Sequence, residues 1–261
     1  MSVTAKHISV RVGCRTLLKR VDFLAQAGQV TAIVGPSGAG KSTLLSVLSG
    51  DIGYEGDVCL NGANIQKRSA ADLAQHRAVL AQSTPLAFPF TVREVVQLGA
   101  AAGMTPEVVS LALAQVGMYD FDQAFYQSLS GGEQQRVQLA RVLCQVWHPV
   151  KGGVARWLFL DEPVSSLDIG HQLRVMQIAR RFADQGGGVV VVLHDLNLTA
   201  MFAESAVLMH DGDVVVQGAP ETVLTAERLG AAYGCDIHVN AAPKAGFYML
   251  PQLASVPRLR G

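Results

Sequence analysis

A glycine-rich run with one lysine and two hydroxyl residues carries the clearest chemical pattern in this sequence. Residues 35–42, GPSGAGKS, fit the spacing G-x-x-x-x-G-K-[ST]. Glycines let the backbone wrap an anion with its N–H groups pointing inward, and the dipole of a following helix adds positive potential. Lys41 can then reach the outer phosphates of a triphosphate, and the hydroxyl of Ser42 can bind Mg²⁺.

The residues on either side of this run have the patterns that such a site needs. Residues 30–34, VTAIV, are typical of a buried strand, and residues 42–48 follow with a helical pattern. The alternative is a glycine-rich turn between strand and helix that binds no ligand. Because the run lies between these two elements, we favour the phosphate site.

Two carboxylates, Asp161 and Glu162, follow a second apolar run at residues 157–160, WLFL. Asp161 could hold Mg²⁺, directly or through water, and Glu162 could activate the attacking water as a general base. Acidic residues also end strands as solvated caps, so the pair alone decides little. Together with the glycine-rich run, it favours hydrolysis of a nucleoside triphosphate.

The composition indicates a globular chain with a sizeable core. Hydrophobic residues make up 49% of the 261 residues, and 21 Lys and Arg balance 21 Asp and Glu. A nucleic-acid binder usually has a basic excess, although a local patch is compatible with a neutral total. No apolar run reaches the roughly 18 residues of a membrane-spanning helix, and residues 1–6 lack a signal-peptide pattern, so we expect a cytoplasmic protein.

The cysteines and several histidines do not suggest a metal centre. We expect reduced, mostly buried thiols at Cys14, Cys59, Cys144 and Cys235, which form no close pair. We expect solvated or capping side chains at His76, His148, His171 and His210.

Strands and helices alternate through most of the chain, which predicts an α/β fold. A third apolar run at residues 188–193, GVVVVL, joins the two above, and continuous apolar strands suit a parallel sheet covered on both faces. Residues 172–182 have a helical pattern. Residues 7–24 and 56–60 indicate shorter, antiparallel strands near the N-terminus.

The middle of the chain has only helical patterns, from residue 91 to about residue 146. We interpret it as a helical subdomain inserted into the α/β core, with a loop rich in Pro and Gly at residues 148–156 leading back. The predicted single domain, residues 1–261, thus has a core of about 1–84 and 155–242, a helical subdomain of about 85–154 and a surface-packed C-terminal tail of about 243–261.

Residues 129–136, LSGGEQQR, resemble the LSGGQ-type signature of ABC ATPases, with Glu133 at the usual Gln position. Ser130, Gly131 and Gly132 open a helix whose N–H groups and hydroxyl can bind an anion. The alternative is a serine-capped helix without a ligand. One chain has no use for two distant γ-phosphate sites, whereas two copies packed head to tail can each face the partner's signature.

The resemblance extends over about residues 3–232 and implies the P-loop NTPase fold of ABC ATPases, with ATP, Mg²⁺ and a homodimer. Gln82 matches the Q-loop, and His194 matches the switch histidine near the γ-phosphate. The D-loop at the dimer interface matches Ser166, Leu167 and Asp168.

The same resemblance implies the set of site residues. The catalytic residues are Lys41, Glu162 and His194, and the Mg²⁺ residues are Ser42, Gln82 and Asp161. The second copy's nucleotide meets Ser130, Gly131, Gly132 and Glu133. The nucleotide-binding residues are Val12, Gly35, Pro36, Ser37, Gly38, Ala39, Gly40, Lys41, Ser42 and Thr43.

Val12 departs from the family pattern, which has an aromatic residue at this place to stack on adenine. Valine keeps an apolar contact but loses stacking worth roughly 1 kcal/mol, which leaves adenine selectivity open. A second departure is Ala81, where importers often have Pro, and we expect little effect from it.

Within the family, the chain is most similar to ATPases of importers for heme, and then to those for siderophores and cobalamin. The residues that carry this likeness are 88–92 (FPFTV), 167–172 (LDIGHQ) and 144–157 (CQVWHPVKGGVARW). It implies an ATPase that energises heme import, with ferric siderophore or cobalamin import as the alternative. A non-hydrolysing switch is disfavoured by Glu162.

The likeness also implies partners and a location. We expect this chain at the cytoplasmic face of the inner membrane, bound to two transmembrane permease subunits. Each subunit would place a short helix in a groove near residues 84–91. A periplasmic heme-binding protein is expected as an indirect partner. Soluble family members of DNA repair or translation usually have tandem ATPase domains, coiled coils or zinc modules. None is evident in this sequence, so we expect no nucleic-acid partner.

Overall fold

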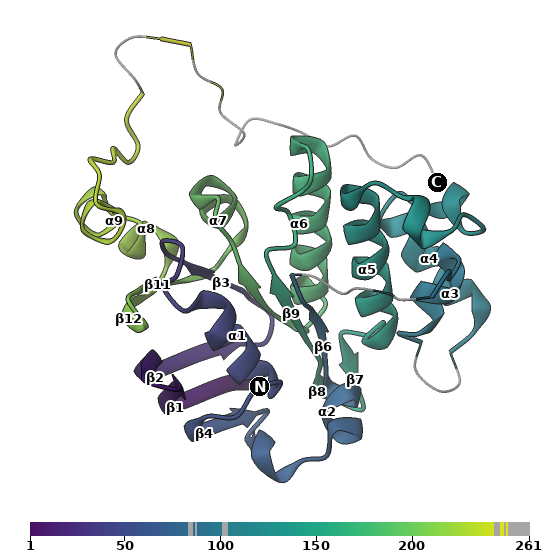
Figure 1. Cartoon of the computed structure of the whole chain (residues 1–261), viewed down its shortest axis with the longest axis horizontal. Helices are drawn as coiled ribbons and strands as arrows, with labels where there is room; N and C mark the ends of the chain where they lie inside the picture. The colour runs from purple at the N-terminus through teal and green to yellow at the C-terminus, as the bar shows by residue number, and fades with distance from the viewer. Residues whose placement is uncertain (83–85, 87, 101–103, 243–245, 248, 250–261) are drawn as a thin grey trace.

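Two β-sheets enclose the helix that follows the glycine-rich run (Figure 1). The structure is a computed structural model that describes residues 1–82, 86, 88–100, 104–242, 246–247 and 249. Within them, the central sheet contains, in spatial order, β12 (Asp213–Gly218), β11 (Ser205–His210), β3 (Val30–Val34), β10 (Gly188–Val192), β9 (Trp157–Asp161) and β6 (Arg77–Leu80).

The central sheet is parallel except at one edge. Strands β11, β3, β10, β9 and β6 run parallel, and β12 pairs antiparallel with β11. Every residue of β3, β9 and β10 is buried, as the three continuous apolar runs predict for strands covered on both faces.

The second sheet is antiparallel and covers one face of the first. Its strands, in spatial order, are β2 (Arg15–Gln26), β1 (Ser2–Val12), β4 (Glu55–Leu60) and β5 (Ala63–Asn64). Helix α1 (Lys41–Ser49) lies between the sheets, where Leu44 and Leu48 share a core with Leu18, Trp157 and Phe159. The predicted α/β fold with an antiparallel N-terminal portion is confirmed.

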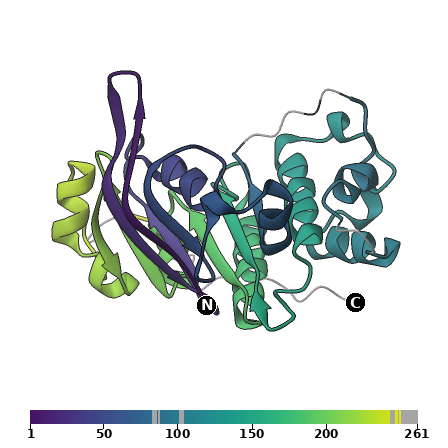
Figure 2. The same ribbon diagram turned by 90° about the horizontal axis from the view of Figure 1, so that it is seen from below.

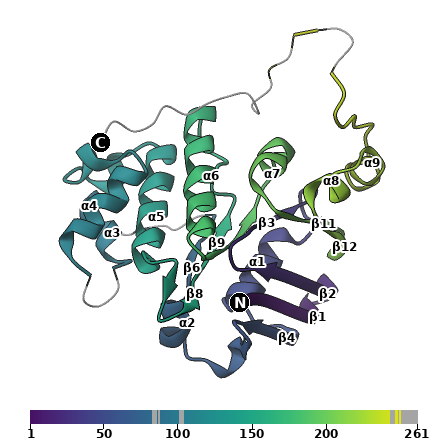
Figure 3. The same ribbon diagram turned by 180° about the vertical axis from the view of Figure 1, so that it is seen from behind.

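Helices cover the other face of the central sheet (Figure 3). They include α6 (Ile169–Asp184) and α7 (Leu196–Phe202), while α8 (Pro220–Val223) and α9 (Ala226–Tyr233) lie at the β11–β12 end. The short helix α2 (Ala70–His76) precedes β6.

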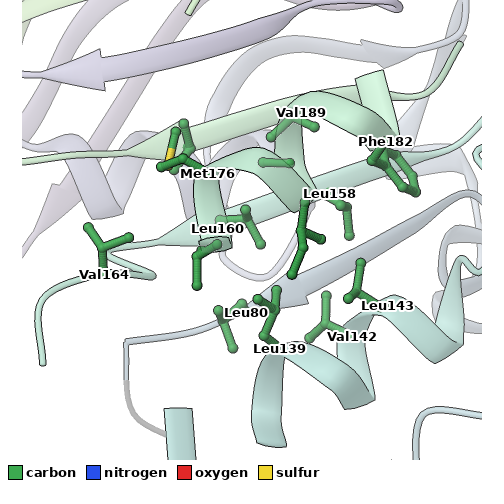
Figure 4. Packing of buried hydrophobic residues seen from close by; sticks show 14 of the residues in the cluster. Leu80, Leu139, Val142, Leu143, Leu158, Leu160, Val164, Met176, Phe182 and Val189 are labelled. Atoms are coloured by element: carbon green, nitrogen blue, oxygen red, sulfur yellow. The ribbon is translucent and has the colours of Figure 1, made fainter. Parts of the chain in front are cut away.

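The predicted helical segment contains α3 (Val92–Gln97), α4 (Pro106–Gln115) and α5 (Gly131–Gln145), at the end of the molecule opposite α8 and α9 (Figure 2). Figure 4 shows how Leu139, Val142 and Leu143 of α5 pack against Leu80 of β6 and Leu158 of β9. The helices therefore share one continuous core with the parallel sheet. The subdomain boundaries remain a prediction.

Several local predictions differ from the structure. The expected loop at residues 148–156 contains a hairpin of β7 (Val150–Lys151) and β8 (Val154–Ala155). Gly152 and Gly153 connect its strands with φ of 58° and 76°, a conformation that suits two-residue hairpin turns. The prediction of mostly buried thiols is wrong. Cys144 is buried, Cys59 is half-buried, and Cys14 and Cys235 are exposed.

Two predicted features fall outside the described residues. Most of the expected tail at residues 243–261 is not described, nor are residues 83–85 and 87 of the expected groove. Across the helices that the structure describes, none is long and apolar enough to span a bilayer.

Gly188 provides a test of how tightly the parallel strands pack. A Cβ at this position would lie 2.3 Å from the ring of the buried Trp157, whose Nε1 donates to Asn61 Oδ1 at 3.1 Å. Because that hydrogen bond fixes the ring, we expect Gly188→Ala to lower the free energy of unfolding by about 1–3 kcal/mol in urea denaturation.

Gly53→Ala is the matched control, because a Cβ there meets nothing within 4 Å. It should change the free energy of unfolding by less than about 0.5 kcal/mol. Equal stability of the two variants would contradict a fixed Trp157 ring.

Candidate functional site

The glycine-rich turn between β3 and α1 has a backbone that requires glycine at several places. Gly35 has φ of 147°, and a Cβ there would lie 2.2 Å from the carbonyl oxygen of Met209 in β11. Gly40 caps α1 with φ of 97°, and a Cβ there would lie 3.0 Å from the carbonyl oxygen of Leu17. The turn is thus pressed against both sheets.

The turn between β11 and β12 braces the glycine-rich turn from outside. Gly212 N donates to the carbonyl oxygen of Ala39 at 3.1 Å, and Lys19 N donates to the carbonyl oxygen of Gly212 at 2.8 Å. Lys19 Nζ also donates to Asp211 Oδ2 at 2.7 Å. Two segments distant in sequence, the β11–β12 turn and β2, therefore hold the glycine-rich turn in place.

A cavity of about 460 Å³ opens at this turn, within the usual size of small-molecule sites. Of the predicted residues, its lining includes Ser37, Gly38, Gly40, Lys41, Ser42, Thr43, Gln82, Glu162 and His194. The polar groups converge because β3, β6, β9 and β10 are parallel and their carboxyl ends meet at one edge of the sheet.

Lys41 is only 6% exposed, and its ammonium rests on the turn itself. Nζ donates to the carbonyl oxygens of Gly35 and Pro36, both at 2.9 Å. Burial lowers the pKa of Lys41 from its ordinary value, against the opposing charges of Glu162 and Asp161. A poorly hydrated cation at the cavity wall is suited to bind an anion.

Ser42 and Asp161 form a pair of oxygen ligands. Ser42 Oγ donates to Asp161 Oδ1 at 2.9 Å, and Asp161 is 8% exposed. Burial raises the pKa of Asp161, although the hydrogen bond from Ser42 and the charge of Lys41 oppose this.

This donor set fits Mg²⁺, which prefers oxygen ligands and commonly takes one or two from protein, with the rest from phosphate and water. In the described part of the chain, no cluster of three or more His, Cys, Asp or Glu side chains could hold a metal. With two ligands from the protein, an ion held by Ser42 and Asp161 would take its remaining ligands from phosphate and water.

The carboxylate of Glu162 is held from both sides. Gln82 Nε2 donates to Glu162 Oε2 at 3.1 Å, and His194 Nε2 lies 2.5 Å from Glu162 Oε1. Gln82 therefore contacts the predicted base directly, and its contact with Mg²⁺, which the resemblance implies, stays a prediction. His194 reaches Glu162 because β10 and β9 are in register, with Val192 opposite Asp161.

Glu162 has a left-handed backbone with φ of 48°, which is rare for a residue other than glycine. Such a conformation costs about 1–3 kcal/mol and persists only where the surroundings enforce it. Its occurrence at the cavity, in a residue whose carboxylate contacts Gln82 and His194, agrees with a functional role.

The signature residues lie outside this cavity and are self-capped. Ser130 is the N-cap of α5 and forms a capping box with Glu133, whose carboxylate accepts from Ser130 N at 2.8 Å and from Ser130 Oγ at 2.7 Å. These bonds lower the pKa of Glu133. The hydroxyl expected to be free for an anion is therefore engaged.

The D-loop residues pack against the start of α5. A Cβ on Gly132 would lie 3.0 Å from the carbonyl oxygen of Ser166 and 3.3 Å from the side chain of Leu167. Asp168 caps α6 and accepts from His171 N at 2.9 Å. Signature and D-loop thus form one surface, and none of their predicted residues is in the lining of the 460 Å³ cavity.

Five lining residues were not predicted from the sequence: Arg15, Thr16, Leu17, Asp211 and Gly212. They belong to two hairpins that only folding brings to the cavity, and no local motif identifies them. Val12, predicted to contact adenine, is 64% exposed at the end of β1 and is absent from the described lining.

Known proteins resemble this chain over most of its length. Residues 18–165 match the family described as ABC transporter. The chain is 54% identical over 256 residues to the hemin import ATP-binding protein HmuV of Jannaschia sp. (strain CCS1), covering 97% of this chain and 95% of that protein. It is 51% identical over 259 residues to the protein of the same name from Roseobacter denitrificans (strain ATCC 33942 / OCh 114), covering 98% and 99%.

Solved structures show the same fold. A nucleotide-free ATP-binding cassette from an ABC transporter superposes with a TM-score of 0.77 at 20% identity, covering 89% of this chain and 99% of that chain. An ATP-binding subunit of an ABC transporter gives 0.76 at 20% identity, covering 90% and 97%.

Asp161→Asn tests the cost of the buried charge. Because burial raises the pKa of Asp161, its ionised form is disfavoured in the folded protein. Asn keeps an oxygen to accept from Ser42 and carries no charge, so we expect a free energy of unfolding higher by about 1 kcal/mol at neutral pH.

The gain should vanish as the pH falls below about 4, where the wild-type carboxyl is protonated in both states. Urea denaturation at neutral and acidic pH measures both quantities. A variant less stable than the wild type at neutral pH would contradict this account of Asp161.

Proposed function

Because this chain belongs to the ABC transporter family, we propose that it is the ATP-hydrolysing subunit of an importer, with heme as the cargo. The observation that carries the proposal is the Glu162 carboxylate, held between Gln82 and His194 in the cavity that Lys41 and Ser42 also line. It is a base placed beside an anion site.

Several residues in and beside the cavity have distinct roles in hydrolysis. The N–H groups of the glycine-rich turn bind the phosphates, and Lys41 turns from the carbonyl oxygens of its own turn to the outer phosphates. Glu162 accepts the proton of the attacking water, and His194 fixes its carboxylate and lies near the γ-phosphate. Ser42 and Asp161 would hold Mg²⁺, with Gln82 close by, and the ion would supply positive charge to the phosphates.

A second copy completes the site. The N-terminus of α5, with Ser130, Gly131 and Gly132, is separate from the cavity of its own chain, so in a head-to-tail homodimer it faces the partner's ATP. The Glu133 carboxylate then has to leave Ser130 for the γ-phosphate to take its place, because two anions cannot share those donors. Ser166, Leu167 and Asp168 lie beside that interface.

The relatives' printed names support heme as cargo. Two permease subunits then receive the motion of the ATPase dimer at the cytoplasmic face of the inner membrane, and a periplasmic heme-binding protein delivers the cargo. In the expected groove at residues 84–91, the described Phe88 is 68% exposed and offers an apolar contact to a permease helix.

Transport by reconstituted vesicles tests the proposal. Vesicles with the permease, a heme-binding protein and this chain should take up heme only with ATP. The matched Glu162→Gln protein should bind ATP but lower uptake and ATP hydrolysis by about 10²-fold or more, because the general base is lost. Uptake of a ferric siderophore or cobalamin in preference to heme would contradict the cargo. Recovery of the chain on DNA or ribosomes instead of a permease would contradict transport.

A further inference from the structure

The signature helix α5 contacts the main chain of Glu162 through a side chain that the mechanism above does not use. Gln135 Nε2 donates to the carbonyl oxygen of Glu162 at 2.9 Å. The same oxygen also accepts from Ser165, from its N at 3.3 Å and its Oγ at 3.2 Å. Ser165 lies three residues after Glu162, whereas Gln135 donates to this carbonyl from a different element, α5.

A hydrogen bond to the carbonyl oxygen of Glu162 bears on the backbone conformation that directs two carboxylates to one cavity. In an extended strand, neighbouring side chains point to opposite faces, so Asp161 and Glu162 would diverge. The left-handed conformation of Glu162, with φ of 48°, interrupts that alternation. Asp161 reaches Ser42 and Glu162 reaches His194, both on the same cavity. A donor that fixes the carbonyl of Glu162 also fixes this turn of the chain.

Packing alone does not account for a glutamine at position 135. Its Oε1 is buried, and none of the described residues donates to it. An unpaired buried oxygen is costly, and a site that needs only volume favours an apolar side chain. A cavity of about 250 Å³, which Gln82 and Ser165 also line, lies beside Gln135. Gln135 therefore shares this cavity with Gln82, the glutamine that contacts the Glu162 carboxylate.

We propose that Gln135 is a positioning residue for hydrolysis, which holds the strained main chain of Glu162 so that its carboxylate faces the attacking water. The proposal rests on the function proposed above. It also gives α5 a part in both sites of the dimer. Its first turn, at Ser130, meets the nucleotide of the second copy, while Gln135, in the following turn, sets the base of its own chain.

The test is Gln135→Met, which keeps the length of the side chain and removes its donor. We expect kcat for ATP hydrolysis to fall about 10- to 100-fold, because a small displacement of a catalytic group has an effect of this size. The KM for ATP should stay within about twofold, since the phosphate donors are untouched. If this variant does not fold, Gln135→Leu also removes the donor, adds no charge and carries the same expectation.

Gln145→Met is the matched control on the same helix. Gln145 Nε2 donates to the carbonyl oxygens of Ala74 and Arg77, at 3.1 Å and 3.0 Å, and it does not line the nucleotide cavity. It should lose thermal stability at least as much as Gln135→Met while keeping kcat within about twofold of the wild type.

A Glu162→Gln background separates action through Glu162 from other effects. There, Gln135→Met should lower single-turnover hydrolysis no further and should leave the ATP-trapped dimer intact, because residues that act as a unit are not additive.

Three results would overturn the inference alone: a kcat for Gln135→Met equal to that of Gln145→Met, a raised KM with unchanged kcat, or a further loss in the Glu162→Gln background. A wild-type chain without ATPase activity, or a Glu162→Gln variant as fast as the wild type, would overturn the proposed function and this inference with it.

Discussion

A triphosphate needs donors on every side of its terminal phosphate, and the cavity of this chain provides them on one side only. The glycine-rich turn, Lys41 and Ser42 form one wall, and Glu162 and His194 complete its edge. The helix N-terminus that could supply the remaining donors begins at Ser130, outside the lining of that cavity. This division of the donors between two surfaces is why the account requires a second copy.

The fold solves the positioning problem with the carboxyl edge of a parallel sheet. Strands β3, β6, β9 and β10 end together, so the turns that follow them bring four segments to one cavity. Close packing makes the arrangement stiff: Gly35 leaves no room for a Cβ beside Met209, and Gly212 ties the turn to Ala39. The left-handed backbone of Glu162 is held in place by the Gln135 hydrogen bond and by the contacts of its carboxylate with Gln82 and His194.

The donors at the start of the signature helix already have a partner within the chain. The capping box places the Glu133 carboxylate on the amide and hydroxyl of Ser130, where a phosphate of the partner is expected. A carboxylate at a helix N-terminus is stabilising, so it competes with the incoming anion. In the proposed dimer, closure would exchange one negative group for another at the same donors, so that the N–H groups at the helix start have a partner in both states.

Much of the fold could be predicted from the sequence, because buried parallel strands are continuous apolar runs, and the glycine-rich run, the acidic pair and His194 each follow one. The match over residues 18–165 confirms the family predicted from the signature, and Ser42 meets Asp161 as the strand ends imply. The hairpin at residues 150–155 was missed because two-residue strands have no periodicity. Arg15 and Asp211 reach the cavity only through hairpin pairing, which no local motif predicts. The S-x-x-E pattern at Ser130 does predict a capping box, but we favoured an anion site there.

Mixing two inactive variants tests the shared site most directly. Lys41→Ala disables the phosphate wall and Ser130→Arg disables the signature, so a mixed dimer concentrates both defects in one site and leaves the other intact. An equal mixture should regain up to about a quarter of wild-type phosphate release in a single turnover, because half of the dimers are mixed and each has one intact site of two. A mixture no more active than its components, or Ser130→Arg alone at the wild-type rate, would contradict a site built from two chains.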